Sequence, residues 1–137
     1  KGVFMEKTFI MIKPDGVERR LMGEIIGRIE RKGFKITKAQ IKKPARELVE
    51  EHYAEHKGKP FFEELVEYIS GKTVMAMEVE GDSVIEVMRL MIGHRDPKVA
   101  LPGTIRGDFA NKLTENIIHG SDSAESADRE LKLWFNA

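Results

Sequence analysis

Residues 8–12 (TFIMI) restrict the fold most, because the segment is apolar, β-branched and aromatic and shows no polar alternation. A strand of this kind is buried on both faces, so it lies in the interior of its sheet. The turn-forming residues 13–16 (KPDG) follow and end the strand. We therefore expect a sheet of several strands with this segment at its centre.

The next segments alternate between helical and extended patterns. Met22, Ile25 and Ile29 recur at helical spacing, and Gly33 follows as a helix-ending residue. Residues 34–41 predict a second strand, in which the apolar alternation slips by one residue and so indicates a bulge. The lysines of this strand are typical of a sheet edge.

The middle of the chain predicts a pair of helices, a strand and a further helix. Residues 44–53 and 61–69 form the helix pair, interrupted by glycine and proline. Residues 73–79 predict a third, largely buried strand, followed by a turn at Gly81-Asp82. Residues 84–91 then show helical periodicity.

The C-terminal segment supplies one more strand and one more helix. Residues 116–119 predict a short fourth strand. Asp122 and Glu125 have capping-box spacing before the last helix. The inward positions of that helix are Ala127, Leu131 and Trp134. The order β-α-β, inserted α-hairpin, β-α-β predicts an α+β fold, a ferredoxin-like split βαβ sandwich with a four-stranded antiparallel sheet.

The composition excludes several classes of protein. The chain has 137 residues, no cysteine, and 23 basic against 23 acidic residues. The length suits a single domain over residues 1–137, and the lack of cysteine excludes a disulfide framework or a Cys-ligated metal. A net charge of zero argues against a nucleic-acid partner. No apolar run suits a membrane span or a signal peptide, so we expect a cytoplasmic protein without a membrane partner.

The motif at residues 116–123 (NIIHGSDS) is the strongest candidate for chemistry. It places His119 at a strand end, with Gly120 leaving space beside the ring, and a helix N-terminus that suits a phosphate group follows. A neutral imidazole is a nucleophile when an acceptor holds one of its nitrogens. Glu130, about two turns into that helix, is the candidate acceptor. A hydrogen-bonded core histidine is the alternative interpretation of His119.

Three cationic side chains are candidates for phosphate binding. Lys13 ends the first strand, which a ferredoxin-like sheet places beside the fourth, so Lys13 should lie near His119. Arg89 follows the third strand, and Arg106 lies in the loop at residues 101–109 (LPGTIRGDF). Together the three would neutralise a polyphosphate, whereas each alone is more simply a surface charge.

Three further features carry alternatives. His52 and His56 are one helical turn apart, but no third ligand of suitable spacing accompanies them, so we interpret them as an exposed pair. Phe61 is either a core residue or a platform on which a base stacks. Residues 31–36 (RKGFKI) partly fit the aromatic motif of an RNA-recognition fold, which leaves an RNA-binding module as a competing interpretation.

Taken together, these segments resemble nucleoside diphosphate kinases over residues 8–135. The motifs that carry the resemblance are IKPDGV (12–17), GEII (23–26), KPFF (59–62), PGTIRGDF (102–109), NIIHGSDS (116–123) and LWF (133–135). The resemblance implies that the γ-phosphate of ATP or another nucleoside triphosphate passes to a nucleoside diphosphate by a ping-pong reaction. In the reaction implied by the resemblance, His119 carries the phosphoryl group between the two nucleotides as a phosphohistidine on Nδ1. It also implies that Mg²⁺ is bound through nucleotide phosphates and not by protein ligands.

The resemblance further implies roles for individual residues. Glu130 and Ser121 hold the imidazole of His119, and Lys13 acts beside the phosphate that is transferred. Phe61 and Leu113 lie on the two faces of the base, and Asn116 binds the ribose. The complete nucleotide-binding set is Lys13, Tyr53, Phe61, Arg89, Arg95, Arg106, Leu113 and Asn116.

Two features depart from the family pattern. Arg95 stands where the family usually has threonine, so it either contacts a phosphate or turns to solvent. Many relatives continue beyond the LWF motif with a tail that packs on neighbouring subunits, whereas this sequence ends at Ala137. We expect a homo-oligomer, a hexamer rather than a tetramer. A catalytically silent scaffold with the same fold is the remaining alternative.

Overall fold

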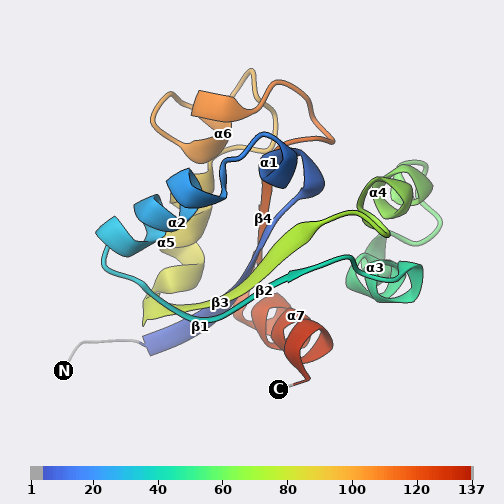
Figure 1. Cartoon of the computed structure of the whole chain (residues 1–137), viewed down its shortest axis with the longest axis horizontal. Helices are drawn as coiled ribbons and strands as arrows, with labels where there is room; N and C mark the ends of the chain where they lie inside the picture. The colour runs from blue at the N-terminus through green and yellow to red at the C-terminus, as the bar shows by residue number, and fades with distance from the viewer. Residues whose placement is uncertain (1–4, 137) are drawn as a thin grey trace.

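The computed structural model describes residues 5–136. Residues 1–4, part of the segment in which the sequence predicts no signal peptide, and residue 137 lie outside it. Its centre is an antiparallel sheet with the strand order β2-β3-β1-β4 (Figure 1). The strands are β1 (Met5–Ile12), β2 (Lys35–Lys42), β3 (Val74–Asp82) and β4 (Ile118–Gly120). The helices are α1 (Pro14–Glu18), α2 (Met22–Arg31), α3 (Arg46–His52), the 3₁₀ helix η1 (Ala54–His56), α4 (Phe62–Ile69), α5 (Val84–Ile92), α6 (Ile105–Phe109) and α7 (Ala124–Phe135).

The strand order confirms the ferredoxin-like α+β prediction. β1 is an interior strand, paired with β3 on one side and β4 on the other, and its residues 8–12 are buried. β2 lies at the sheet edge and carries the predicted register shift, between Ile36 and Lys38. The helix pair α3–α4 lies to one side of the sheet, as expected of an inserted hairpin (Figure 1).

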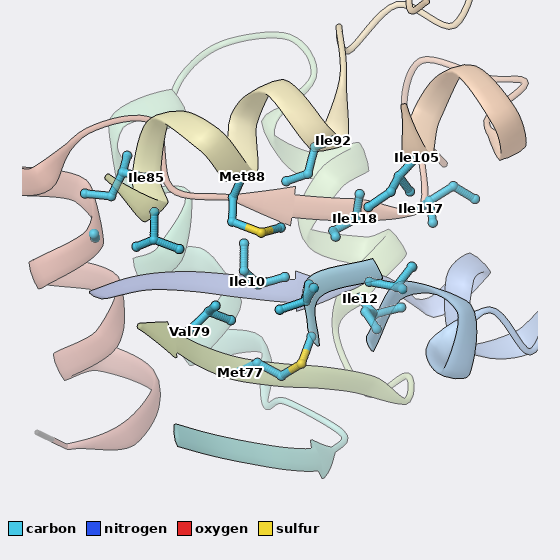
Figure 2. Close-up of a cluster of buried hydrophobic side chains, with 14 of the residues drawn as sticks. Ile10, Ile12, Met77, Val79, Ile85, Met88, Ile92, Ile105, Ile117 and Ile118 are labelled. Atoms are coloured by element: carbon cyan, nitrogen blue, oxygen red, sulfur yellow. The ribbon is translucent and has the colours of Figure 1, made fainter. Parts of the chain in front are cut away.

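Helices cover both faces of the sheet and divide the core into two clusters. On one face, α2 and α5 pack over the sheet, and Figure 2 shows Met88 and Ile92 pointing toward Ile10 and Ile118. On the other face, side chains of α3, α4 and α7 enclose Phe9 and its neighbours. Successive residues of β1 point to opposite faces, so every position in residues 8–12 is buried against one layer or the other. This explains the lack of polar alternation in that segment.

Two predicted turns are helix or strand in the structure. Pro14 opens the short helix α1, because proline has the backbone angle of a first helical residue and needs no amide donor there. Gly81 and Asp82 continue β3, paired with Glu6 and Met5. A Cβ on Gly81 would lie 2.4 Å from the ring of Phe34, so the glycine lets that ring cover the strand.

The C-terminal boundaries also differ from the prediction. β4 begins only at Ile118, because Ile117 has a φ of 80° and interrupts the extended backbone. Ser123, and not Asp122, caps α7, since its side chain accepts a hydrogen bond from the amide of Ser126. The three predicted inward residues of α7 are buried as expected. Within residues 5–136 the structure contains no helix with the length and apolar character of a membrane span.

Candidate active site

A cavity of about 420 Å³ opens where β1 ends, between the α3–α4 hairpin, the loop around α6 and the start of α7. It brings together residues from most of the chain. Of the residues predicted from the sequence, all but Ser121 line it: Lys13, Tyr53, Phe61, Arg89, Arg95, Arg106, Leu113, Asn116, His119 and Glu130. Ser121 is buried behind the cavity, against Glu130.

His119 is held at one ring nitrogen and open at the other. It lies on β4 opposite Met11, and its Nε2 is 2.9 Å from Oε1 of Glu130. Because a carboxylate only accepts hydrogen bonds, Nε2 carries the proton and the lone pair lies on Nδ1. The side chain of His119 is 20% exposed, which leaves the ring accessible from the cavity. The ring can therefore act as a nucleophile through Nδ1.

Glu130 is buried yet remains a good acceptor. The hydroxyl of Ser121 donates to its Oε1 at 2.7 Å, beside the bond from His119. Burial alone would raise the pKa of Glu130, but the hydrogen bond from His119 and the nearby histidine and serine outweigh burial and lower that pKa. The carboxylate is thus negatively charged next to the imidazole, where it would stabilise positive charge on the ring.

Lys13 lies at the end of β1, on the strand next to His119, as predicted. Its Nζ donates to Oδ1 of Asn116 at 2.8 Å, although the two residues are 103 positions apart. Both side chains are buried. Burial, together with the charge of Arg106, lowers the pKa of the Lys13 ammonium from 10.5 to about 7. A bound phosphate would favour the charged form and raise that pKa again.

Arg106 is a buried cation fixed by backbone carbonyl groups. It donates to the carbonyl oxygens of Asn116 at 3.3 Å, Gly93 at 3.3 Å and Ile118 at 2.6 Å. Burial and the nearby Arg89 lower its pKa to about 10, so it stays charged at neutral pH. The guanidinium charge of Arg106 therefore lies next to the backbone of residues 116–118, just before His119.

Arg106 lies on the short helix α6 and not in a loop as predicted from residues 101–109, because Thr104 provides a helix cap that local pattern did not show. Thr104 caps α6, because its hydroxyl accepts a hydrogen bond from the amide of Gly107. A Cβ on Gly107 would lie 1.9 Å from the carbonyl oxygen of Leu101, so only glycine fits there. The two remaining arginines lie at the sides of the cavity: Arg89 donates to the carbonyl oxygen of Gly120, and the exposed Arg95 accepts a bond from Asn116 through its own carbonyl oxygen.

The mouth of the cavity is apolar. Phe61 is 41% exposed and Leu113 is 58% exposed, and both line the cavity. Because a core phenylalanine would be buried, the exposure favours the interpretation of Phe61 as a stacking platform over the core alternative. Tyr53 lies deeper, and burial raises the pKa of its phenol, which therefore stays neutral.

His52 corrects the interpretation of an exposed histidine pair. It is only 3% exposed, and its ring meets the ring of His119 edge to face at 4.6 Å between centroids. Its Nδ1 accepts a hydrogen bond from Nε1 of Trp134 at 3.0 Å. The signal was present in the sequence, since His52 follows the apolar Val49 by three residues and so shares the inward face of the helix.

The same residues could be taken for a metal centre. Ligand atoms of His52, His119 and Glu130 lie within 4.8 Å of one another. However, Oε1 of Glu130 already accepts two hydrogen bonds, and Nδ1 of His52 accepts the bond from Trp134, which leaves its proton on Nε2. Nε2 of His52 has no hydrogen-bond partner among the described residues, but a protonated ring nitrogen does not ligate a metal. We therefore do not assign the three residues to a resident metal.

A cationic interior below an exposed aromatic mouth suits a polyphosphate that carries a base, which places the protein among nucleotide-dependent phosphotransferases. A family model described as nucleoside diphosphate kinase matches residues 6–137. A nucleoside diphosphate kinase from Exiguobacterium sibiricum is 61% identical over 131 residues, which are 96% of this chain and 95% of that protein. One from Saccharolobus islandicus is 55% identical over 132 residues, 96% of each chain.

Solved structures agree with the sequence relatives. The nucleoside diphosphate kinase of Halobacterium salinarum, in complex with CDP, has a TM-score of 0.94 at 45% identity, covering 98% of this chain and 90% of that one. The enzyme of Encephalitozoon cuniculi has a TM-score of 0.94 at 44% identity, covering 96% of this chain and 90% of that one. The chain belongs to the nucleoside diphosphate kinase family, and it is an enzyme of that type.

These findings do not favour the RNA-binding or scaffold alternatives. An RNA-recognition module binds RNA on the open face of its sheet. In this chain helices cover both faces, and the second core cluster buries Phe9, Met11 and Ala76 under α3, α4 and α7. The interior strands β1 and β3 are largely buried and offer no open face for stacked bases, whereas the edge strand β2 remains mostly exposed.

Proposed function

We propose that the enzyme transfers the γ-phosphate of a nucleoside triphosphate to a nucleoside diphosphate through a phosphohistidine on Nδ1 of His119. The single observation that carries this mechanism is the bond from Nε2 of His119 to Glu130, which leaves Nδ1 as the free nucleophile. Phosphoryl transfer depends mainly on positioning and on charge stabilisation. The cavity supplies both, through a fixed ring and several nearby cations.

The reaction has two halves that use the same cavity. In the first, the Nδ1 lone pair forms a bond to the γ-phosphorus, the bond from that phosphorus to the bridging oxygen breaks, and the nucleoside diphosphate leaves with the oxygen. In the second, a terminal oxygen on the β-phosphate of the acceptor attacks the phosphorus, and the phosphorus–nitrogen bond breaks. Glu130 keeps the proton on Nε2 and stabilises the positive ring of the intermediate.

The nucleotide is oriented by charge at one end and by stacking at the other. Lys13, Arg89 and Arg106 are the phosphate ligands, with Arg95 as a further cation at the rim. Tyr53 and Asn116 bind near the sugar, and Phe61 and Leu113 enclose the base. Stacking accepts any base, so we expect broad nucleotide tolerance. The Halobacterium salinarum relative in complex with CDP supports a nucleoside diphosphate as the ligand of this cavity.

Mg²⁺ fits this site as a companion of the nucleotide. The carboxylates that line the cavity are Glu55, Asp122 and Glu130. Glu130 is occupied by hydrogen bonds, so the lining does not form an octahedral cage of protein oxygens. The ion would instead be held by the phosphates of the nucleotide, where it neutralises part of their charge.

We further infer that the protein acts in the cytoplasm as a homo-oligomer, with a hexamer favoured over a tetramer. Several large apolar side chains are exposed in the single chain, namely Ile41 on the edge strand, Leu90, Val99 and Leu101. Contacts between subunits would bury such residues. Sedimentation equilibrium gives the mass of the assembly and distinguishes six subunits from four.

Intact mass spectrometry tests the phosphohistidine directly. The protein is exposed briefly to Mg-ATP and then to GDP. We expect a single acid-labile phosphoryl adduct that disappears on addition of GDP and never forms in His119→Ala. If folded, nucleotide-binding protein forms no adduct, the ping-pong mechanism is wrong.

A further inference from the structure

The backbone at Ile117 takes a form that a β-branched residue rarely adopts. Its φ is 80°, and the amide of Ile118 donates to the carbonyl oxygen of Asn116 at 2.9 Å, which closes a three-residue γ-turn around Ile117. The positive-φ form of this turn is rare and strained. A strained residue persists only where its surroundings hold it. Ile117 lies one residue after Asn116 and two before His119, so the strain falls inside the active site.

Residues 13–16, which follow β1, bind both the amide and the carbonyl group of Ile117. Oδ2 of Asp15 accepts a bond from the amide of Ile117 at 3.0 Å, and the amide of Lys13 donates to the carbonyl oxygen of Ile117 at 2.8 Å. A Cβ on Gly16 would lie 2.9 Å from that carbonyl oxygen, so the glycine allows the close approach. Asp15 is thus the only side chain among residues 5–136 that the structure shows bonded to the Ile117 amide.

Tyr68, near the end of α4, holds Asp15 in turn. Its hydroxyl donates to Oδ1 of Asp15 and accepts a bond from the amide of Asp15 at 2.9 Å. Burial and the bond to Asp15 raise the pKa of Tyr68, so the hydroxyl remains a donor throughout the neutral range. The carboxylate is therefore fixed at one oxygen by Tyr68 and presents the other to Ile117.

We propose that Tyr68 and Asp15 are positioning residues that hold the turn at Ile117 and thereby set the distance between His119 and the phosphate-binding cations. The proposal rests on the phosphohistidine mechanism at His119. Neither side chain belongs to the nucleotide-binding set, and neither lines the cavity. Their effect on the reaction passes through the backbone.

The neighbours of the turn show why its shape matters. Arg106 donates to the carbonyl oxygens of Asn116 and Ile118, on either side of Ile117. Lys13 binds the side chain of Asn116. If Ile117 relaxed to an ordinary extended backbone, the peptide groups on its two sides would rotate relative to each other. The cations bound to Asn116 would then move relative to His119, and small errors of this kind are costly in phosphoryl transfer.

The test uses Tyr68→Phe, Asp15→Asn and the double variant. Glu78→Gln is the matched control, because Glu78 is also a buried carboxylate bonded to a hydroxyl, that of Thr37, but does not line the cavity. Rapid quench with Mg-ATP gives the rate constant of His119 phosphorylation and the final amount of phosphohistidine per chain. Amide chemical shifts of Asn116 and His119 in the nucleotide-free protein report the turn independently of the reaction.

We expect Asp15→Asn to lower the phosphorylation rate constant at least about tenfold and Tyr68→Phe about threefold, with the final phosphohistidine content unchanged. Since Tyr68 acts through Asp15, the double variant should be no slower than Asp15→Asn alone. The shifts of Asn116 and His119 should move in these variants and not in Glu78→Gln.

Three results would overturn the proposal: a Tyr68→Phe rate within experimental error of wild type, a loss of rate matched by an equal loss of phosphohistidine content, or an equal effect in Glu78→Gln. A wild-type protein that forms no adduct contradicts the mechanism at His119 instead. In that case the amide shifts still decide whether the turn depends on Tyr68 and Asp15.

Discussion

The charge of Glu130 can be removed while its hydrogen-bonding shape is kept. In Glu130→Gln, the amide oxygen can occupy the position of Oε1, which accepts the bonds from His119 Nε2 at 2.9 Å and from the Ser121 hydroxyl at 2.7 Å. The amide nitrogen takes the place of Oε2. Both donors thus keep an acceptor, and the main change is the loss of one negative charge beside the imidazole.

The size of the effect follows from the type of hydrogen bond. A bond to a charged group contributes about 1.5–3 kcal/mol, whereas a neutral bond contributes about 0.5–1.5 kcal/mol. The difference of about 1–2 kcal/mol is greatest when the ring becomes positive on bonding to phosphorus. Each 1.36 kcal/mol of barrier is tenfold in rate, so phosphorylation of His119 should slow by about 5- to 30-fold.

Rapid quench of the reaction with Mg-ATP measures this rate constant, and urea titration checks that the variant is folded. Glu125→Gln is the control, because it makes the same charge change at an exposed position on the same helix. We expect that control to react at the wild-type rate. A Glu130→Gln rate within twofold of wild type, or an equal loss in Glu125→Gln, would refute the local electrostatic role of Glu130.

Three further predictions follow from the cations of the cavity. Because burial and Arg106 lower the pKa of Lys13 from 10.5 to about 7, the unfolded chain binds more protons between those values. The free energy of unfolding, measured by urea titration, should therefore rise with pH between about 7 and 10.5. The affinity for nucleotide, measured by nucleotide titration, should fall above pH 7 as the ammonium loses its proton. Neither trend should appear in Lys13→Met. Arg106→Ala removes the guanidinium donor of three carbonyl oxygens, of which that of Asn116 still accepts the amide of Ile118. The loss should lower the free energy of unfolding by about 3 kcal/mol in urea. Arg95→Thr should raise the KM for nucleotide about two- to fivefold without changing kcat, as expected of an exposed charge, and an unchanged KM would place Arg95 in solvent.

Much of the scaffold follows from local patterns. Residues 8–12 lack polar alternation because β1 supplies side chains to two core clusters, so the pattern alone indicates an interior strand. The slipped alternation and the lysines of residues 34–41 likewise indicate a bulged edge. The ends of the strands are less predictable. Local pattern predicts a turn at Gly81, but the structure has Gly81 in β3, where Phe34 packs over it.

The candidate site was predictable to the extent that its chemistry lies in a contiguous motif. His119 stands at a strand end, before glycine and a helix start, and Glu130 lies further along that helix. Their bond at 2.9 Å confirms the expected pairing. The burial of His52 follows from the inward helix face that it shares with Val49, which the interpretation as an exposed pair overlooked. Its contact with His119 was not predictable, because a single helix pattern does not show which side chain of another element it meets.

By itself, the sequence determined the order of the four strands and the longer helices, the interior position of β1 and the local setting of His119. The reason is that hydrophobic period, glycine, proline and capping residues act over a few positions. Only the tertiary structure decided how distant groups pair. Lys13 with Asn116 and Asp15 with Ile117 are separated by 103 and 102 positions. Such bonds depend on strand register and on the burial that excludes water, and neither property can be predicted from a short segment of the chain.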